Sequence, residues 1–408
     1  MNVRRTAAAL AAAAVIGAVA APVAHAADPS PSASPSAALP SGLYGTGDPT
    51  YDGVWRQSLA LLAQDAVGVR PAGKAVDWLT GQQCANGAFA SYRADTGKAC
   101  DAKTMLDTNA TAAAVQALAA LGGHDAETGK AVSWLKSVQN EDGGWGFGAG
   151  SPTDTNSTSV VIGALAAAGE KPAEVTRKGN SPYDALLALA LPCDEDGGGA
   201  FAYQPDKKGK LAANADATAA GVLGALGKGL GAEAGEPGNA PECADAESPE
   251  QAAANGAAYL ADAVAEDGHL VSALPGAENQ PDYGNTADAV VALAAQGGAE
   301  RAAKPLEWLQ RNSADWAKQN GPAAYAQLIF ATLATGGDPR DFGGDDLVER
   351  LNATGPAPQA AGADEGERDD SAEEESDTSM LWVVGALFVG GIGVGFLLSG
   401  RKKKGPQA

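Results

Sequence analysis

Hydrophobic residues recur with helical periodicity from Val54 to Leu351, and no convincing alternating pattern of a strand interrupts them. Clusters of Gly, Pro and Asn divide this region into short segments, as is typical of helices joined by turns. The segments come in pairs, an amphipathic helix followed by a helix of small apolar residues such as Val160 to Leu165. A helix that is apolar on every side must be buried on every side. The pattern therefore predicts an all-α domain in which the second helix of each pair lies inside.

The pairs are internal repeats with loops of variable length. The segments Lys74–Phe89 and Lys130–Trp145 correspond residue by residue, and three weaker copies follow between residues 183 and 316. Stacked helix pairs of this kind close into a ring. We therefore expect an α/α toroid (barrel) of five to six helix pairs over residues 42–352.

Both ends of the sequence have the composition of targeting and linking segments. Residues 1–26 combine two arginines, an Ala/Val-rich run and an A-x-A site, which predicts a secretory signal peptide. Residues 27–41 are a Pro/Ser-rich linker, and residues 353–379 are an acidic stretch that we expect to be a disordered stalk. Residues 380–399 hold 20 residues without a charge, and the basic tail 400–408 follows. This predicts one C-terminal transmembrane helix with a cytoplasmic tail.

Composition narrows the range of partners. The sequence has 28 basic and 50 acidic residues, and this excess of negative charge repels nucleic acid, so no nucleic-acid partner is expected. The richness in Ala, Gly and Pro with few Lys suggests a bacterial source. Together with the two end segments, it predicts an exported bacterial protein held in the cell membrane by a single pass, with its bulk outside the cell.

Four cysteines in an exported chain predict two disulfides, for which three pairings exist. We favour Cys84–Cys100 and Cys193–Cys243 because each pair brackets the loop of one repeat. No C-x-x-C motif occurs and the histidines are isolated, so neither a metal site nor a cofactor is expected.

Four of the small-residue helices open with a short polar stretch, the first at Asp107–Thr111 and the second at Asp154–Thr158. Such side chains cap helix N-termini. Because all four stretches begin inner helices, they also lie at one end of the ring, where they form a polar collar over an apolar cavity, a common design for a ligand site. The predicted ligand-binding residues are Asp107, Asn109, Asp154, Asn156, Asn214, Asp216, Asp282 and Asn285.

The repeats resemble the QW repeats of the terpenoid cyclase and protein prenyltransferase α/α toroid superfamily, also described as prenyltransferase/squalene oxidase repeats. The copy that ends at Trp145 fits with Gln139 ahead of the aromatic residue, and the copy that ends at Phe89 fits with Gln83. The resemblance spans roughly residues 54–351. It implies that these four residues are structural, because in the family the Gln amide stacks on the aromatic ring and ties adjacent outer helices together.

The catalytic branches of that superfamily need groups that this sequence lacks. Class II cyclases carry D-x-D-D-T at the helix opening, and its middle Asp protonates the substrate. Here Asn109 and Asn156 stand in the place of that acid, and Asp216 stands there without neighbouring carboxylates. Protein prenyltransferases need an Asp/Cys/His zinc set, which is absent. The branch that remains similar is that of the cobalamin carriers, whose α/α barrel is not an enzyme and binds its ligand at the mouth.

These observations predict a surface-anchored, non-enzymatic toroid. It would bind a small molecule, a corrinoid or an isoprenoid, at the polar mouth of its cavity and deliver it to a membrane transporter. Two alternatives stay open. One is a terpene or squalene cyclase-like enzyme with Asp216 as general acid, and the other is a surface adhesion or structural protein.

Overall fold

The computed structural model describes residues 39–237, 243–273, 277 and 279–360. The chain divides into two units, residues 1–361 and 362–408, and all the described residues belong to the first. The predicted signal peptide, transmembrane helix and basic tail lie outside the described residues, as do most of the linker and most of the stalk. Of the helices in the described ranges, none combines the length and the apolar character needed to cross a membrane.

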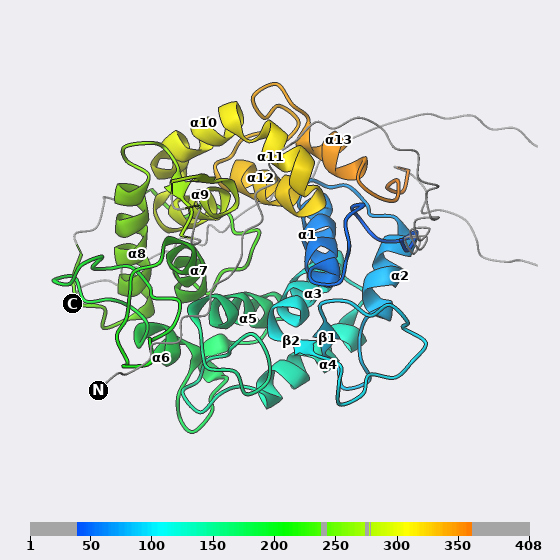
Figure 1. Ribbon diagram of the computed structural model, residues 1–408, viewed down its shortest axis with the longest axis horizontal. Helices are drawn as coiled ribbons and strands as arrows, with labels where there is room; N and C mark the ends of the chain where they lie inside the picture. The colour runs from blue at the N-terminus through cyan, green and yellow to red at the C-terminus, as the bar shows by residue number, and fades with distance from the viewer. Residues whose placement is uncertain (1–38, 238–242, 274–276, 278, 361–408) are drawn as a thin grey trace, which may run out of the picture. The chain divides into compact units, whose positions relative to one another are not determined.

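The described chain is mostly helical (Figure 1). Its helices are α1 (Gly53–Ala66), α2 (Gly73–Gly81), α3 (Thr108–Leu121), α4 (Asp125–Ser137), α5 (Thr155–Ala167), α6 (Pro182–Leu187), α7 (Ala215–Ala225), α8 (Pro249–Ala263), α9 (Tyr283–Gly297), α10 (Ala303–Asn312), α11 (Ala314–Asn320), α12 (Pro322–Ala334) and α13 (Leu347–Asn352). Two 3-10 turns, η1 (Pro172–Glu174) and η2 (Ala299–Ala302), follow α5 and α9.

Two short antiparallel ladders interrupt the helical pattern. Strand β1 (Phe89–Ala90) pairs with β2 (Leu106–Asp107), and β3 (Leu270–Val271) pairs with β4 (Pro281–Asp282). The strands are two residues long, which is too short to give an alternating pattern in the sequence. Each ladder leads directly into an inner helix, so it fixes the point at which that helix begins.

The helices form two concentric layers, as Figure 1 shows down the axis of the toroid. The inner ring consists of α1, α3, α5, α7, α9 and α12; each packs against the next, and α12 packs against α1 to close the ring. The remaining helices lie outside. The predicted α/α toroid is thereby confirmed for the described residues.

Small residues bring the inner helices close together. In α5 the side chains of Val161, Ile162 and Leu165 are fully buried, as expected of a helix that neighbours cover on every side. Gly224 of α7 approaches α5 so closely that a Cβ atom would lie 2.5 Å from the Ser159 hydroxyl oxygen. A larger residue at position 224 would push the two helices apart.

The repeat residues Gln139 and Trp145 connect the outer layer. The Trp145 ring is buried and its Nε1 donates to the Leu135 carbonyl at 2.8 Å. The Gln139 Nε2 donates to the Gly143 carbonyl at 2.7 Å and to the Val175 carbonyl at 3.1 Å. Val175 follows the next inner helix, α5, in the chain. The amide thus ties its own turn to the following repeat.

The preceding repeat makes the same connection. Gln83 Nε2 donates to the Gly87 carbonyl at 3.0 Å and to the Glu127 carbonyl of α4 at 2.8 Å, and Phe89 is fully buried. The two disulfides that the sequence favours are also present, Cys84–Cys100 and Cys193–Cys243.

Candidate functional site

The first residue of each polar opening is a helix N-cap. Its side-chain oxygen accepts a hydrogen bond from the backbone N–H three residues later and so satisfies one of the free donors at the helix start. The four bonds join Asp107 to Ala110 (2.9 Å), Asp154 to Ser157 (2.7 Å), Asn214 to Ala217 (2.8 Å) and Asp282 to Asn285 (3.1 Å). These side chains position the inner helices.

The fifth residue of each opening, a threonine, ties the inner helix to the turn before it. Its hydroxyl accepts a hydrogen bond from the backbone N–H of the buried aromatic or leucine residue of the same repeat. The bonds are Phe89 to Thr111 (2.9 Å), Trp145 to Thr158 (3.0 Å), Phe201 to Thr218 (3.0 Å) and Leu270 to Thr286 (3.0 Å). The first and fifth residues of the opening therefore both serve the fold.

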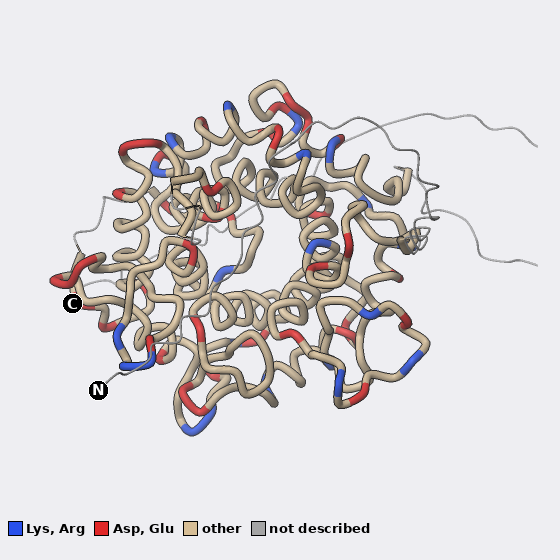
Figure 2. The backbone as a smooth tube through the Cα atoms, viewed as in Figure 1, with Lys and Arg blue, Asp and Glu red and all other residues tan. Residues whose placement is uncertain are grey.

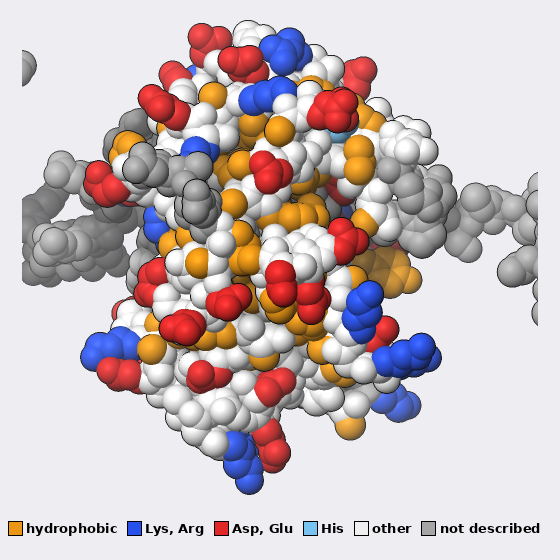
Figure 3. Space-filling view, turned by 90° about the vertical axis from the view of Figure 1, so that its left-hand side faces the viewer, with side chains coloured by type: hydrophobic (Ala, Val, Ile, Leu, Met, Phe, Trp, Pro, Cys, Tyr) orange, Lys and Arg blue, Asp and Glu red, His pale blue; other side chains and the backbone are white. Residues whose placement is uncertain are grey.

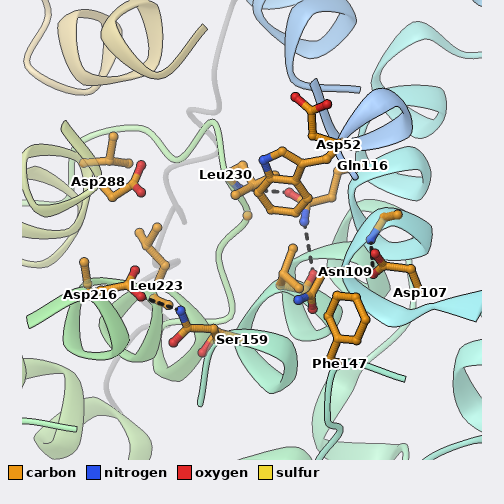
Figure 4. Close-up of a pocket in the computed structure, with 18 of the residues that line it drawn as sticks. Asp52, Asp107, Asn109, Gln116, Phe147, Ser159, Asp216, Leu223, Leu230 and Asp288 are labelled. Atoms are coloured by element: carbon orange, nitrogen blue, oxygen red, sulfur yellow. Dashed lines mark hydrogen bonds between the residues drawn. The ribbon is translucent and has the colours of Figure 1, made fainter. Parts of the chain in front are cut away.

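The third residue of the opening faces inward. Asn109, Asn156 and Asp216 occupy this place in α3, α5 and α7, and all three line a cavity of about 350 Å³ within the ring (Figure 4). In α9 the third residue is Gly284, and the neighbouring Asn285 donates to the Asp282 carboxylate at 2.8 Å.

The structure thus brings together four of the eight predicted residues. Asp107, Asn109, Asn156 and Asp216 line the cavity. The other four, Asp154, Asn214, Asp282 and Asn285, are not among its lining residues. They lie in the cap interactions at the helix starts.

Several lining residues were not predicted. The most informative is Asp288, which lies one turn into α9 on the same wall as Asp216 (Figure 4). A single carboxylate in the otherwise apolar stretch of α9 was a signal in the sequence. The aromatic side chains of Tyr51, Trp55 and Phe147 also line the cavity. Tyr51 precedes α1, Trp55 lies in its first turn and Phe147 lies in the loop before α5, where no repeat pattern marks them.

The two carboxyls on this wall are held by amides. Asn156 Nδ2 donates to Asp216 at 2.9 Å, and Gln327 Nε2 of α12 donates to both oxygens of Asp288 at 3.1 Å. Burial raises the pKa of Asp288 to about 7, against the Gln327 hydrogen bonds, and the negative charges of Asp216 and Asp282 add to the rise. Burial also raises the pKa of Asp216, and the Asn156 hydrogen bond opposes this.

Three polar atoms of the lining residues have no hydrogen-bond partner among the described residues. They are Asn109 Oδ1, Asn156 Oδ1 and Ser159 Oγ. Each is shielded from solvent. A buried acceptor without a partner costs about 1–3 kcal/mol. This arrangement suits a ligand that brings hydrogen-bond donors into the cavity.

Comparison with known proteins bears out the fold. Residues 54–168 and 114–211 match the family model of the prenyltransferase alpha-alpha toroid domain. Residues 54–211 are thus similar to the prenyltransferase alpha-alpha toroid domain. No curated protein matches it significantly.

A search of solved structures finds similar chains at low identity and with TM-scores below 0.5. A protein from Actinoplanes is 15% identical with a TM-score of 0.46, over 71% of this chain and 92% of that one. A sugar epimerase from a ruminal bacterium is 14% identical with a TM-score of 0.47, over 73% and 93%. The ent-copalyl diphosphate synthase from Streptomyces platensis is 17% identical with a TM-score of 0.43, over 69% and 50%.

The cavity of the toroid domain has a floor. The loop after α7 enters the ring, and its residues Lys228, Gly229 and Leu230 line the cavity (Figure 4 labels Leu230). Gln116 of α3 holds this loop, since its Oε1 accepts from the Leu230 N–H at 2.8 Å while its Nε2 donates to the Val160 carbonyl at 3.1 Å. This loop therefore lines the predicted apolar cavity on the side of Gln116.

Negative charge surrounds the cavity. Carboxylates occur on the inner ring as well as on the outer loops (Figure 2), and they are scattered over the side of the toroid domain that Figure 3 shows. The lining residues include Asp52, Asp107, Asp216 and Asp288 but one basic residue, Lys228. In the described ranges no group of three or more His, Cys, Asp or Glu side chains is placed to hold a metal ion.

Proposed function

We propose that the toroid domain binds a small molecule in its central cavity without transforming it. The observation that carries this proposal is a pair of amide oxygens on the wall of a cavity of about 350 Å³. These oxygens, Asn109 Oδ1 and Asn156 Oδ1, have no hydrogen-bond partner in the part of the chain that the structure describes. Donors of a bound ligand would remove the cost of leaving these oxygens unpaired. Apolar residues of the same wall, such as Val160 and Leu223, would contact its body.

The chemistry of the wall favours some of the predicted ligands over others. An isoprenoid hydrocarbon would leave the asparagine oxygens unpaired, and its diphosphate would face the Asp107 and Asp216 carboxylates. A corrinoid, by contrast, carries many amide donors. So large a ligand would fill the cavity with one edge and cover the aromatic side chains of Tyr51 and Phe147 with the rest.

The two ends of the sequence indicate where in the cell this binding would take place. Residues 1–26 have the pattern of a signal peptide and residues 380–399 that of a membrane span. We propose that the domain is held outside the cell membrane by this single span. A binder in that position can pass its ligand to a membrane transporter.

A thermal-shift screen of the full chain tests the proposal. Corrinoids, isoprenoids and sugars are added one at a time, and a ligand present at 100 times its dissociation constant should stabilise the fold by about 2.7 kcal/mol. Ala220 lines the cavity, so Ala220→Trp should fill it and remove the shift. No shift with any compound would favour the adhesion alternative.

One observation favours a second candidate function, that of a cyclase-like enzyme. Asp216 does not act alone, because Asp288 lies on the same wall and has a pKa of about 7. A carboxylic acid that keeps its proton near neutral pH can serve as a general acid. Conversion of an isoprenoid by the full chain, abolished by Asp216→Asn and by Asp288→Asn, would establish this function. Binding without conversion would exclude it for that compound.

A further inference from the structure

The wall formed by α7 and α9 concentrates negative charge without a balancing cation. Among the described residues, the partners of the Asp216 and Asp288 carboxyls are the neutral amides of Asn156 and Gln327. The charges that act on Asp288 are those of Asp216 and Asp282, both negative. Two carboxyls whose charges act on each other resist being ionised together in an apolar setting.

The basic residue of the cavity, Lys228, does not neutralise the Asp216 and Asp288 carboxyls. The Lys228 ammonium donates to the backbone carbonyls of Glu233 at 3.0 Å and Ala295 at 3.3 Å. Those carbonyls belong to the floor loop and to the last turn of α9. Lys228 therefore holds the floor in place, and the carboxyl wall stays uncompensated.

Two further acceptors lie beside this wall without partners. Ser159 is 4% exposed and its Oγ has no hydrogen-bond partner in the described chain, and neither has Asn156 Oδ1. Asn156 already gives its amide hydrogen to Asp216, so its oxygen is free to accept. An incoming group that donates several hydrogen bonds would find the carboxylate and amide oxygens of this wall together, while the Ser159 hydroxyl faces Gly224 of α7.

Aromatic rings line other parts of the same cavity. Figure 4 shows Phe147 across the cavity from Asp216 and Asp288, and Trp55 and Tyr51 also line it. The face of an aromatic ring attracts a cation, and its body packs against an apolar or aromatic ligand. Both the carboxyl wall and the rings therefore favour positive charge in the ligand.

We propose that the ligand of this cavity carries an ammonium group that binds between Asp216 and Asp288, with an apolar or aromatic body toward Phe147 and Trp55. This inference rests on the proposed function and narrows its donor-bearing ligands to cationic ones. The ammonium donates to both carboxylates and to Asn156 Oδ1. The proton that the carboxyls hold in the empty cavity leaves to solvent as the cation arrives.

Three probes on one scaffold test the inference by titration calorimetry with the full chain. Tryptamine is cationic, tryptophol is its neutral counterpart, and indole-3-propionate is anionic. We expect tryptamine to bind about ten- to a hundredfold more tightly than tryptophol, the effect of one charge-assisted hydrogen bond, and indole-3-propionate to bind weakest.

Substitutions assign the preference to the wall. Asp216→Asn and Asp288→Asn should each reduce the preference for tryptamine over tryptophol by about tenfold or more. Asp77→Asn, on the exposed face of α2, removes the same charge far from the cavity and should leave the preference unchanged. Retained binding of tryptophol would show that the substituted cavities are still folded.

Equal affinities for tryptamine and tryptophol would overturn the inference, as would a preference that survives both cavity substitutions. Failure of all three probes to bind would overturn it too. The proposed function is decided separately, because a corrinoid carries no ammonium group. If a corrinoid raises the unfolding temperature in the thermal screen and Ala220→Trp abolishes this rise, the proposed ligand cavity stands even if the ammonium site is disproved.

Discussion

The first and third residues of the same helix opening have different roles in this toroid: the first caps the helix and the third lines the cavity. Asp107 is buried, caps α3 and accepts a second hydrogen bond from the Ser91 hydroxyl at 2.8 Å. Asn109, two residues later, lines the cavity, and its Oδ1 has no hydrogen-bond partner within the described ranges. A capping motif thus supplies rigidity at one position and an unsatisfied group at another. The contrast locates function at the residues that the fold does not use.

The largest expected effect comes from comparing two tryptophans, one that supports the fold and one that lines the cavity. Trp145 is buried and hydrogen-bonded to the Leu135 carbonyl, so Trp145→Ala should lower the free energy of unfolding by about 3–5 kcal/mol. Trp55 is partly exposed to the cavity, so Trp55→Ala should cost less stability and weaken ligand binding more. Chemical denaturation measures the first effect and titration the second. The opposite order of stabilities would contradict this division.

The pH dependence of stability gives the next largest effect. The pKa of Asp288 is raised from 3.8 to about 7 in the folded state, so the folded chain holds this proton more tightly than the unfolded chain. Its contribution to stability is therefore lost as the pH rises from about 4 to 7. In Asp288→Asn that loss should disappear. The free energy of unfolding of the variant should therefore rise relative to that of the wild type between pH 4 and 8.

Denaturation curves at several pH values measure this difference. Asp77→Asn, which changes an exposed carboxyl of α2, serves as the matched control and should follow the wild type. Parallel stability profiles for the wild type and Asp288→Asn would show that burial does not protect the Asp288 proton.

The smallest effect compares neighbouring side chains in one helix. Asp107→Ala removes a cap and should cost about 0.5–2 kcal/mol of stability. Asn109→Ala removes an oxygen that no described residue bonds, so stability should change by less than about 0.5 kcal/mol while ligand affinity falls. A large loss of stability in Asn109→Ala would assign this residue to the fold instead.

The fold was predictable because its determinants are local and repeated. The apolar α5 stretch, the Gln139–Trp145 turn and the bracketing of loops by cysteines all lie within single repeats. Both disulfides and the closed ring of helices follow from them. The openings also showed where inner helices start, because capping side chains act over three residues.

The rest of the site depends on contacts between distant segments. The floor loop has no periodicity, and its place depends on Gln116, which is 114 residues from Leu230 in the sequence. Predicting that Asp288 lines the cavity would have required knowing which face of α9 meets the cavity. In the α9 opening, Gly284 takes the third place, so the neighbouring Asn285 turns to the cap and not to the ligand site. Sequence alone did not separate these cases.

The most direct test of a ligand cavity is the affinity of one compound, selected by the thermal screen, for the wild type and for Ala220→Trp. Ala220 lines the cavity and takes no part in the caps, so the large side chain should exclude the ligand and spare the polar openings. We predict loss of measurable binding by a variant that keeps a cooperative unfolding transition. Unchanged affinity in a folded Ala220→Trp variant would place the ligand elsewhere and contradict the account.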